Sequence, residues 1–459
     1  MSEQSTTFQA RSSVKSADKE HRRTINFNIG KYNAVVPQGK SQFAELNLAR
    51  ERAKNIKWRA IEHLDSYLEL FEANITRRGA KVIWAETAEQ ANAEILRICT
   101  EKNCRVLVKS KSMVTEEIHL NDFLEKNGIE SVETDLGEYI QQLDGEPPYH
   151  IVTPAMHKSK EDVAKLFADK LGTDPHLTPE QLTLVARDVL REKYVQAEVG
   201  ITGANFIIAD TGAVAVTENE GNGRLSAAWP KTHVVVTGIE KVIPSMADLA
   251  LFWPLLATYG TGQKITSYNT IIAGPRQENE KDGPDEMYVI LLDNGRTNIL
   301  ANEKTRESLY CIRCGACLNA CPVYKNIGGH TYSTTYSGPI GAVITPHLRQ
   351  LGEWKHLSHA SSLCGNCTEV CAVKINLHEL LLENRYEAVT EGYAPFAEKV
   401  AWKIWKMAML RRSWMNAANG NMKGRVVNSI GKAWTKHRSK LIFPQKSFNQ
   451  QWKEKYGNR

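Results

Sequence analysis

Short apolar runs alternate with amphipathic segments between residues 81 and 127, and this alternation predicts the first structural elements of the chain. Residues 81–84 and 105–108 are short apolar runs of the kind found in strands. Residues 87–102 and 113–127 repeat apolar side chains at helical spacing. Strands that alternate with helices of this length predict a parallel sheet in an α/β domain.

After Gly200 the apolar pattern becomes richer in strands. Asp210-Thr211-Gly212 lies between two apolar runs and predicts a tight turn. The strands expected in this part are residues 206–209, 213–217, 233–237 and 287–292. Before the α/β part, residues 1–40 are polar and predict a loose arm, whereas residues 43–75 have helical spacing.

The chain is therefore expected to divide into four parts. They are a polar arm and helix (1–70), an α/β domain (71–305), a cysteine-rich domain (306–383) and a basic helical region (384–459). With 459 residues, the chain is long enough to build several domains with a sizeable core. Its 42% apolar and 24% charged content argues against a disordered, collagen-like or membrane-spanning chain.

The beginning of the sequence lacks the apolar segment of a secretory signal. The most apolar stretch, Met246–Tyr259, is too short to cross a bilayer. We therefore expect a cytosolic, reducing compartment, in which clustered cysteines bind metals more often than they form disulfides.

Seven of the nine cysteines lie in two runs between Cys311 and Cys371. The first run has the spacing C-x2-C-x2-C-x3-C-P and ends at Pro322, which is the ligand pattern of bacterial ferredoxins. The second run places Ser361 where the first has its leading cysteine, and Ala372 where the first has proline. Zinc sites usually take their ligands as two separated pairs, so this spacing favours iron–sulfur clusters over zinc.

In ferredoxins the last cysteine of each run binds the cluster of the other run. The same crossover predicts one cluster on four thiolates and a second cluster on three. The first cluster would take Cys311, Cys314, Cys317 and Cys371, and the second would take Cys321, Cys364 and Cys367. The fourth position of the second cluster stays open to Ser361, His356, His359, water or no ligand. The long interval between the runs predicts a domain framed by helices.

Two polar segments of the α/β part are candidate anion sites. Lys109, Ser110, Lys111 and Ser112 follow a predicted strand and precede a predicted helix, where free N–H groups favour an anion. A solvated loop with a serine helix cap explains the same residues. The glycine-rich segment 217–224 offers a second candidate site. Its candidate residues are Glu218, Asn222 and Arg224, with a plain surface loop as the alternative.

Several segments together resemble the lactate utilisation protein B family. They are Lys109–Glu117, Glu133–Glu138, Gly203–Trp229, Ser337–Gly341 and both cysteine runs. The resemblance implies two [4Fe-4S] clusters and a role in carrying electrons during the oxidation of L-lactate to pyruvate, alongside two partner proteins. It also implies that Ser361 is a family trait, and that the α/β part shares the fold of sugar-phosphate isomerases and CoA transferases.

Two hypotheses about function follow. In the first, the protein is an electron-transfer subunit that relays electrons through two clusters within a lactate-oxidising complex. In the second, the α/β domain itself transforms an anionic small molecule and the clusters conduct the electrons. The sequence shows no flavin or nicotinamide motif, which favours the first.

The C-terminal region is strongly basic. Residues 399–459 hold 15 basic residues and one acidic residue, Glu454, although the formal net charge of the whole chain is only +6. Tryptophans at positions 402, 405, 414 and 434 lie among these charges. Docking to an acidic partner or to the acidic remainder of the chain is favoured, and peripheral membrane contact is the alternative. No nucleic-acid partner is expected, because no known binding module accompanies the charge.

Overall fold

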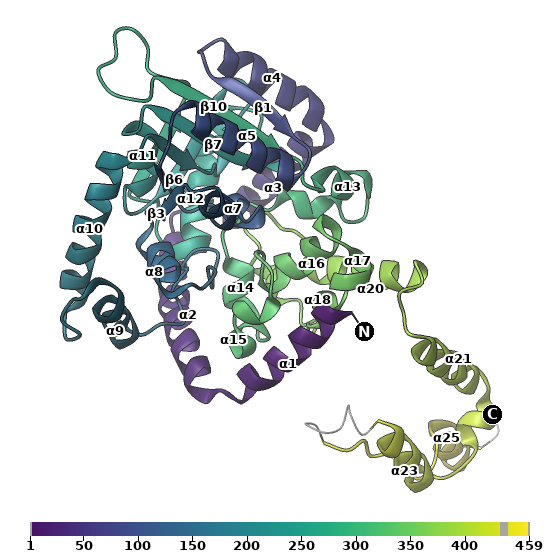
Figure 1. Cartoon of the computed structure of the whole chain (residues 1–459). Helices are drawn as coiled ribbons and strands as arrows, with labels where there is room; N and C mark the ends of the chain where they lie inside the picture. Colours follow the sequence, from purple (N-terminus) through teal and green to yellow (C-terminus); the bar gives the residue numbers. More distant parts are fainter. Residues whose placement is uncertain (1, 432–438, 458–459) are drawn as a thin grey trace. The chain divides into compact units, whose positions relative to one another are not determined.

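The computed structural model describes residues 2–431 and 439–457 (Figure 1). The chain divides into two units, Met1–Ala388 and Val389–Arg459. The first unit contains both sheets and both cysteine runs, and the second contains the basic helices. A finer division of the first unit at residues 70 and 305 stays a prediction.

A parallel sheet of six strands forms the centre of the first unit, as the alternation of strands and helices predicted. In spatial order its strands are β1 (Lys81–Ala85), β10 (Glu286–Leu292), β7 (Thr232–Gly238), β4 (Val199–Thr202), β2 (Val106–Lys109) and β3 (Glu130–Glu133). At the centre of β10, Ile290 pairs with Ile83 on one side and Val236 on the other. These strands are nearly continuous apolar runs because helices cover both faces of a parallel sheet.

A smaller mixed sheet lies beside the first. Its order is β8 (Val242–Ile243), β5 (Phe206–Ile208), β6 (Ala213–Glu218) and β9 (Tyr268–Ile272). The predicted turn at 210–212 joins β5 to β6 as an antiparallel hairpin. Gly212 has a φ of +59°, and a Cβ at this position would lie 2.2 Å from the backbone nitrogen of Ile75. Glycine is therefore required both by the turn and by the close approach of the neighbouring helix.

Helices cover the two sheets. They are α3 (Leu46–Glu62), α4 (Leu64–Thr76), α5 (Ala88–Glu101), α6 (Met113–Glu117), α7 (Leu120–Lys126), α8 (Leu136–Asp144), α9 (Lys160–Leu171), α10 (Pro179–Gln196), α11 (Asn222–Ala228), α12 (Leu249–Thr261) and α13 (Arg296–Ala301). Ile95 and Ile98 of α5 and Leu124 of α7 pack against one face of the large sheet. The opposite face contributes Val235 and Leu291 to a second, larger core.

The cysteine-rich part is helical, as expected. Its helices are α14 (Ala316–Ala320), α15 (Tyr324–Ile327), α16 (Gly338–Leu348), α17 (Leu351–Trp354), α18 (His356–His359), α19 (Asn366–Glu369) and α20 (Leu377–Thr390). In Figure 1 the green helices α14, α15 and α16 lie below the sheet. Cys317 and Cys371 belong to the same apolar core as Val235 of the sheet. The two parts therefore share one interior.

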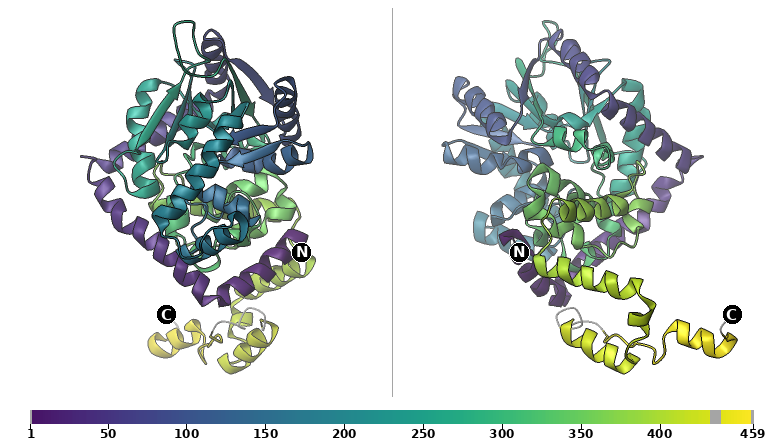
Figure 2. Two further views of the ribbon diagram at one scale, coloured as in Figure 1. Left: turned by 60° about the vertical axis from the view of Figure 1, so that its left-hand side comes forward. Right: turned by 90° about the vertical axis from the view of Figure 1, so that its right-hand side faces the viewer.

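The first forty residues do not form the loose arm that their polarity predicted. They form α1 (Glu3–Ala17) and α2 (Lys19–Lys40), which meet at an angle in the left view of Figure 2. Asp18 ends α1 and caps α2 by accepting a hydrogen bond from the backbone N–H of His21. Ile25 and Ile29, four positions apart on α2, are fully buried. A narrow apolar stripe of this kind is easily missed in a polar sequence.

The second unit contains α21 (Phe396–Leu410), α22 (Arg412–Asn416), α23 (Gly420–Ile430) and α25 (Phe448–Tyr456). Trp402 and Trp405 of α21 are 60% and 55% exposed. Trp434, which the sequence grouped with them, lies outside the described residues. Within the described ranges no helix combines the length and the apolar character needed to span a bilayer.

Candidate functional site

The backbone of the first cysteine run curls around its thiols. Arg313 and Gly315, on either side of Cys314, both have left-handed backbone conformations, with φ of +61° and +78°. This turn lets the backbone N–H of Arg313 donate a hydrogen bond to Cys311 Sγ at 3.4 Å. A left-handed conformation is unfavourable for arginine and, at such positions, commonly marks a functional site.

The second run repeats this backbone. Leu363 and Gly365 flank Cys364 with φ of +53° and +79°. The backbone N–H of Leu363 donates a hydrogen bond to Ser361 Oγ at 3.1 Å. Ser361 therefore occupies the place that Cys311 has in the first run, in agreement with the alignment of the two runs by sequence.

The structure brings the seven thiols together as two sets. Burial, together with the neighbouring thiols of Cys371 and Cys311, raises the pKa of Cys314 to about 12. In the other set, burial raises the pKa of Cys367 to about 11, with Cys321 and Cys364 as its neighbours. The first set comprises Cys311, Cys314, Cys317 and Cys371, and the second comprises Cys321, Cys364 and Cys367.

Backbone N–H groups point at the sulfur atoms of both sets. The N–H of Ala316 hydrogen-bonds to Cys314, and that of Ile340 to Cys317. In the second set, the N–H of Tyr324 donates to Cys321 Sγ at 3.5 Å. A bound metal offsets the repulsion between neighbouring thiolates, and N–H donors stabilise thiolate and sulfide charge. The residues present therefore fit iron–sulfur clusters.

The two sets differ in their exposure. Cys317 and Cys371 of the first set are buried, whereas Cys364 of the second set is exposed. His356, considered as a fourth ligand, packs its ring against Phe8 and Trp354, with centroid distances of 5.3 and 5.9 Å. Ser361 is thus the candidate whose place in the fold corresponds to that of a ligand.

A cavity of about 380 Å³ lies next to the first set of thiols. The sequence suggested two separate anion sites, and the structure joins parts of both in this one cavity. Predicted site residues that line it are Ser110, Lys111, Ser112, Glu218 and Asn222. Arg313 and Cys314 of the first cysteine run also line it. The α/β part and the cysteine-rich part thus meet at a shared cavity.

Two predicted site residues lie elsewhere. Lys109 is completely buried, with its ammonium 2.6 Å from Glu133 and 3.1 Å from Glu116. Burial opposes its charge, but these carboxylates raise the pKa of Lys109 above its usual range. Lys109 is thus an internal counter-ion, because the side chain at the end of β2 points into the body of the domain.

Arg224 does not line the cavity either. Its backbone N–H, together with that of Gly223, donates a hydrogen bond to the carboxylate of Glu218, both at 2.7 Å. Glu218 therefore satisfies the first turn of α11, where free N–H groups favour a negative charge. Although Glu218 lines the cavity, its carboxylate already has hydrogen-bond partners at the start of α11.

Sequence reasoning did not identify two basic residues of the cavity, Lys241 and Arg313. Lys241, at the end of the 3₁₀ turn η1 (Ile239–Lys241), is only 7% exposed and lines the cavity beside Arg313. Burial and the neighbouring Arg313 lower the pKa of Lys241 to about 8. In the sequence it is one lysine in a polar turn between two strands, and no motif marks it.

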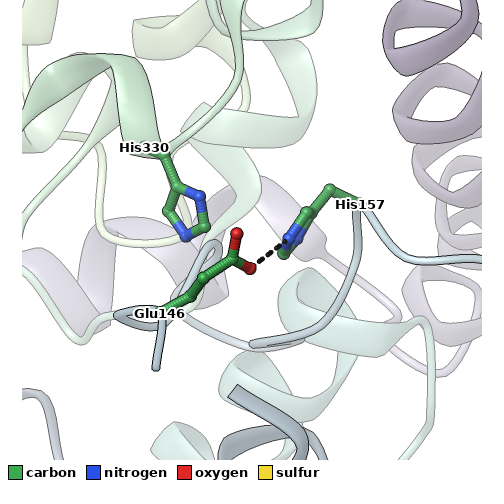
Figure 3. A group of neighbouring side chains, drawn as sticks. All are labelled: Glu146, His157 and His330. Atoms are coloured by element: carbon green, nitrogen blue, oxygen red, sulfur yellow. Dashed lines mark hydrogen bonds and ion pairs between the residues drawn. The ribbon is translucent and has the colours of Figure 1, made fainter. Parts of the chain in front are cut away.

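Glu146, His157 and His330 form a separate polar group (Figure 3). His157 Nε2 lies 3.0 Å from Glu146 Oε2, and His330 Nε2 donates to the carbonyl oxygen of Pro147 at 2.7 Å. Burial and His330 lower the pKa of His157 to about 4, so its ring is neutral near pH 7. Lys158 already pairs with Glu146 at 3.0 Å. The group therefore fastens the loop after α8 to the cysteine-rich part.

Two family models match the chain. Residues 68–292 match the LUD domain, and residues 307–375 match the 4Fe-4S dicluster domain. A solved structure of a DUF162 family protein from Deinococcus radiodurans covers 50% of this chain and 98% of its own. The TM-score is 0.27 and the sequence identity is 15%, so the structural similarity is weak.

Curated relatives match most of the chain. "Lactate utilization protein B" of Bacillus velezensis is 50% identical over 356 residues, which is 77% of this chain and 75% of that protein. The protein of the same name in Bacillus subtilis is 49% identical and covers 77% of this chain and 74% of its own. That of Bacillus licheniformis is 46% identical over 418 residues, or 88% and 87% of the two chains.

The fold and the cysteine sets define an iron–sulfur protein in which an α/β LUD domain precedes a helical 4Fe-4S dicluster domain. The chain belongs to the lactate utilization protein B family. The resemblance stated from its motifs is thereby confirmed.

Proposed function

We propose that this protein carries electrons during the oxidation of L-lactate to pyruvate, as a subunit of a lactate utilisation complex. The observation that carries the proposal is the arrangement of the thiols in two sets. One set lies beside a cavity, with Cys317 and Cys371 buried, and the other reaches the surface at Cys364. The membership of the chain in its family supports lactate utilisation as the setting.

When bound, two [4Fe-4S] clusters would each take up and release one electron. The first set, Cys311, Cys314, Cys317 and Cys371, would hold one cluster, and Cys321, Cys364 and Cys367 would hold the other. Oxidation of lactate to pyruvate releases two electrons and two protons, so two one-electron centres match its stoichiometry. The exposure of Cys364 supports electron transfer from the second set to an external acceptor.

Three basic side chains lie close to Cys311 of the first set. Cys311 lies near the side chains of Lys57, Lys241 and Arg313. Lys57 is fixed there, because its ammonium donates hydrogen bonds to the carbonyl oxygens of Glu240 at 2.5 Å and Val242 at 3.2 Å. Cations near a cluster favour its reduced, more negative state. These residues therefore favour arrival of electrons at the first set.

Metal analysis with electron paramagnetic resonance (EPR) tests the proposal. Protein purified without oxygen should contain the iron and sulfide of two clusters. Cys311→Ser and Cys371→Ser should damage the same EPR signal, and Cys321→Ser should damage the other. Cys99→Ser is the matched control, because Cys99 lies in a separate apolar core and should leave both signals intact. Loss of one shared signal in all three ligand variants would contradict the assignment.

A second candidate function is that the LUD domain itself transforms an anionic small molecule. It is favoured by one observation, namely that Cys314 lines the same cavity as Lys111. The chain purified alone, given L-lactate and an artificial electron acceptor, distinguishes the two functions. Formation of pyruvate without partner proteins would support the second, and no turnover with both clusters present would support a pure relay.

For the basic helices we propose docking to an acidic partner subunit. Residues 399–459 carry 15 basic residues and one acidic residue, whereas the remainder carries 43 basic and 51 acidic residues. Phe396 and Leu410, at the two ends of α21, are 82% and 74% exposed. Removing this region should weaken co-purification with partner subunits in a salt-dependent manner. Equal binding to vesicles of anionic lipid would instead favour peripheral membrane contact.

A further inference from the structure

We propose that Lys241 and Arg313 bind the carboxylate of a small organic acid in the cavity beside Cys314. The inference rests on the proposed function only for the identity of the acid, a short 2-hydroxy acid. The binding site itself follows from the side chains that line the cavity.

Lys241 is the first observation. Lys241 is only 7% exposed, and it lines the cavity. Among the described residues, its ammonium group has no hydrogen-bond acceptor and no ion-pair partner within contact distance. A lysine buried to this extent favours an anionic partner in the cavity that it lines.

Arg313 is the second observation. One terminal nitrogen, Nη2, donates to Glu240 Oε1 at 3.3 Å, and the guanidinium lies over the ring of Tyr336. The other terminal nitrogen, Nη1, is buried and has no partner among the described residues. Arg313 and Lys241 therefore both have donor capacity left in the same cavity.

The carboxylates of this region accept no hydrogen bond from Lys241 Nζ or from Arg313 Nη1 among the described residues. Glu240 accepts hydrogen bonds from Arg296 Nε at 2.5 Å and from Arg313. Burial raises the pKa of Glu240, but Arg296, Arg313 and Lys241 together lower it to about 2. Glu117 is bound to Arg296 at 2.8 Å and to the hydroxyl of Tyr336 at 2.6 Å. Both carboxylates thus already accept hydrogen bonds from guanidinium groups.

The other charges of the cavity favour a single negative charge on the ligand. Lys111 lies 3.4 Å from Asp135, and Glu218 and Glu220 also line the wall. A dianionic phosphate would be repelled by these carboxylates more strongly than a monocarboxylate. The volume of about 380 Å³ is at the small end of ligand sites, as a short organic acid requires. Cys314 in the same wall brings the ligand next to the first set of thiols.

The competing explanation is that both cations only balance the charge of a cluster on Cys311. Titration calorimetry and redox titration, on the full chain with its clusters loaded, separate the two. L-lactate should bind wild type, and Lys241→Met should weaken that binding about 10- to 100-fold, as expected for loss of one charge-assisted contact. Lys241→Arg should restore most of the affinity. Lys325→Met, which removes a cation beside Cys321 instead, is the control and should bind normally.

Three results would overturn the proposal. They are no binding of L-lactate by wild type with both clusters present, tighter binding of inorganic phosphate than of lactate, and a Lys241→Met variant that binds lactate normally while its cluster potential shifts. Calorimetry does not depend on electron transfer. Binding lost on Lys241→Met in a protein without the expected clusters would therefore support this inference while the proposed function failed.

Discussion

Replacement of Lys109 by methionine tests the conclusion that this residue is an internal counter-ion. Its ammonium lies among three glutamates and contacts Glu133 at 2.6 Å, Glu116 at 3.1 Å and the hydroxyl of Thr115 at 3.0 Å. Burial and the neighbouring Glu133 raise the pKa of Glu138 well above its usual value. Lys109 thus supplies positive charge to a buried group that is otherwise acidic.

The expected loss follows from this burial. Methionine keeps most of the apolar stem, so little cavity is created. The main effect is that Glu133, only 4% exposed in its side chain, loses its counter-ion. Removing one partner of a buried ion pair destabilises a protein by about 3–5 kcal/mol. The matched control is Lys193→Met, because Lys193 pairs at 2.6 Å with the half-exposed Glu130. Its loss should be about 1 kcal/mol or less.

Urea unfolding without oxygen, followed by circular dichroism, measures both changes. The difference between wild type and Lys109→Met should shrink as the pH is lowered, because a carboxyl group that takes up a proton no longer needs a counter-ion. A Lys109→Met variant within about 1 kcal/mol of wild type would refute the reasoning. So would a stable variant that has lost lactate binding, because Lys109 would then be a ligand residue.

Other predictions concern the sheet and its surroundings. Burial lowers the pKa of His233 from 6.5 to about 3. As the pH falls through 6.5, this imidazole is therefore protonated in the unfolded chain but stays neutral in the folded chain. Between about pH 7.5 and about pH 5.5, wild type should therefore lose about 1.4 kcal/mol more unfolding free energy than His233→Gln, measured by urea midpoints. Equal losses would contradict this. A Cβ on Gly200 would lie 1.9 Å from the carbonyl oxygen of Ser226. Gly200→Ala should therefore lower stability by about 1–3 kcal/mol or more, whereas Gly30→Ala, in an open helical position, should raise it by about 0.5–1 kcal/mol. Tyr336→Phe removes the 2.6 Å hydrogen bond to buried Glu117 and should cost about 1–3 kcal/mol in the same assay; an unchanged midpoint would show that the bond contributes nothing.

Much of the fold could be predicted because its signals are local. The strands β1, β2, β7 and β10 are short apolar runs, and the turn at 210–212 is marked by its own residues. The crossover of cysteines follows from spacing alone, and the structure groups the thiols in the same two sets. Such features depend on residues that lie near one another in the chain.

The cavity could not be predicted in the same way. Ser110, Asn222, Lys241 and Cys314 are far apart in the sequence, and their meeting depends on strand order and on the docking of the cysteine-rich part. The direction of a side chain is equally hidden. Lys109 and Lys111 are two positions apart, yet one is an internal counter-ion and the other lines the cavity. The helical apolar pattern of α2 was missed because its buried apolar side chains are only two isoleucines, Ile25 and Ile29.

The shared apolar core has a consequence for how the protein is produced. Cys317 and Cys371 pack in the same apolar core as the strands of the large sheet. The sheet and the cysteine runs should therefore unfold together, as one cooperative unit. Any group that binds only the native state stabilises everything that is cooperative with its site. Cells starved of iron should therefore accumulate less of the whole polypeptide, including its LUD domain, because proteases remove chains that spend longer unfolded.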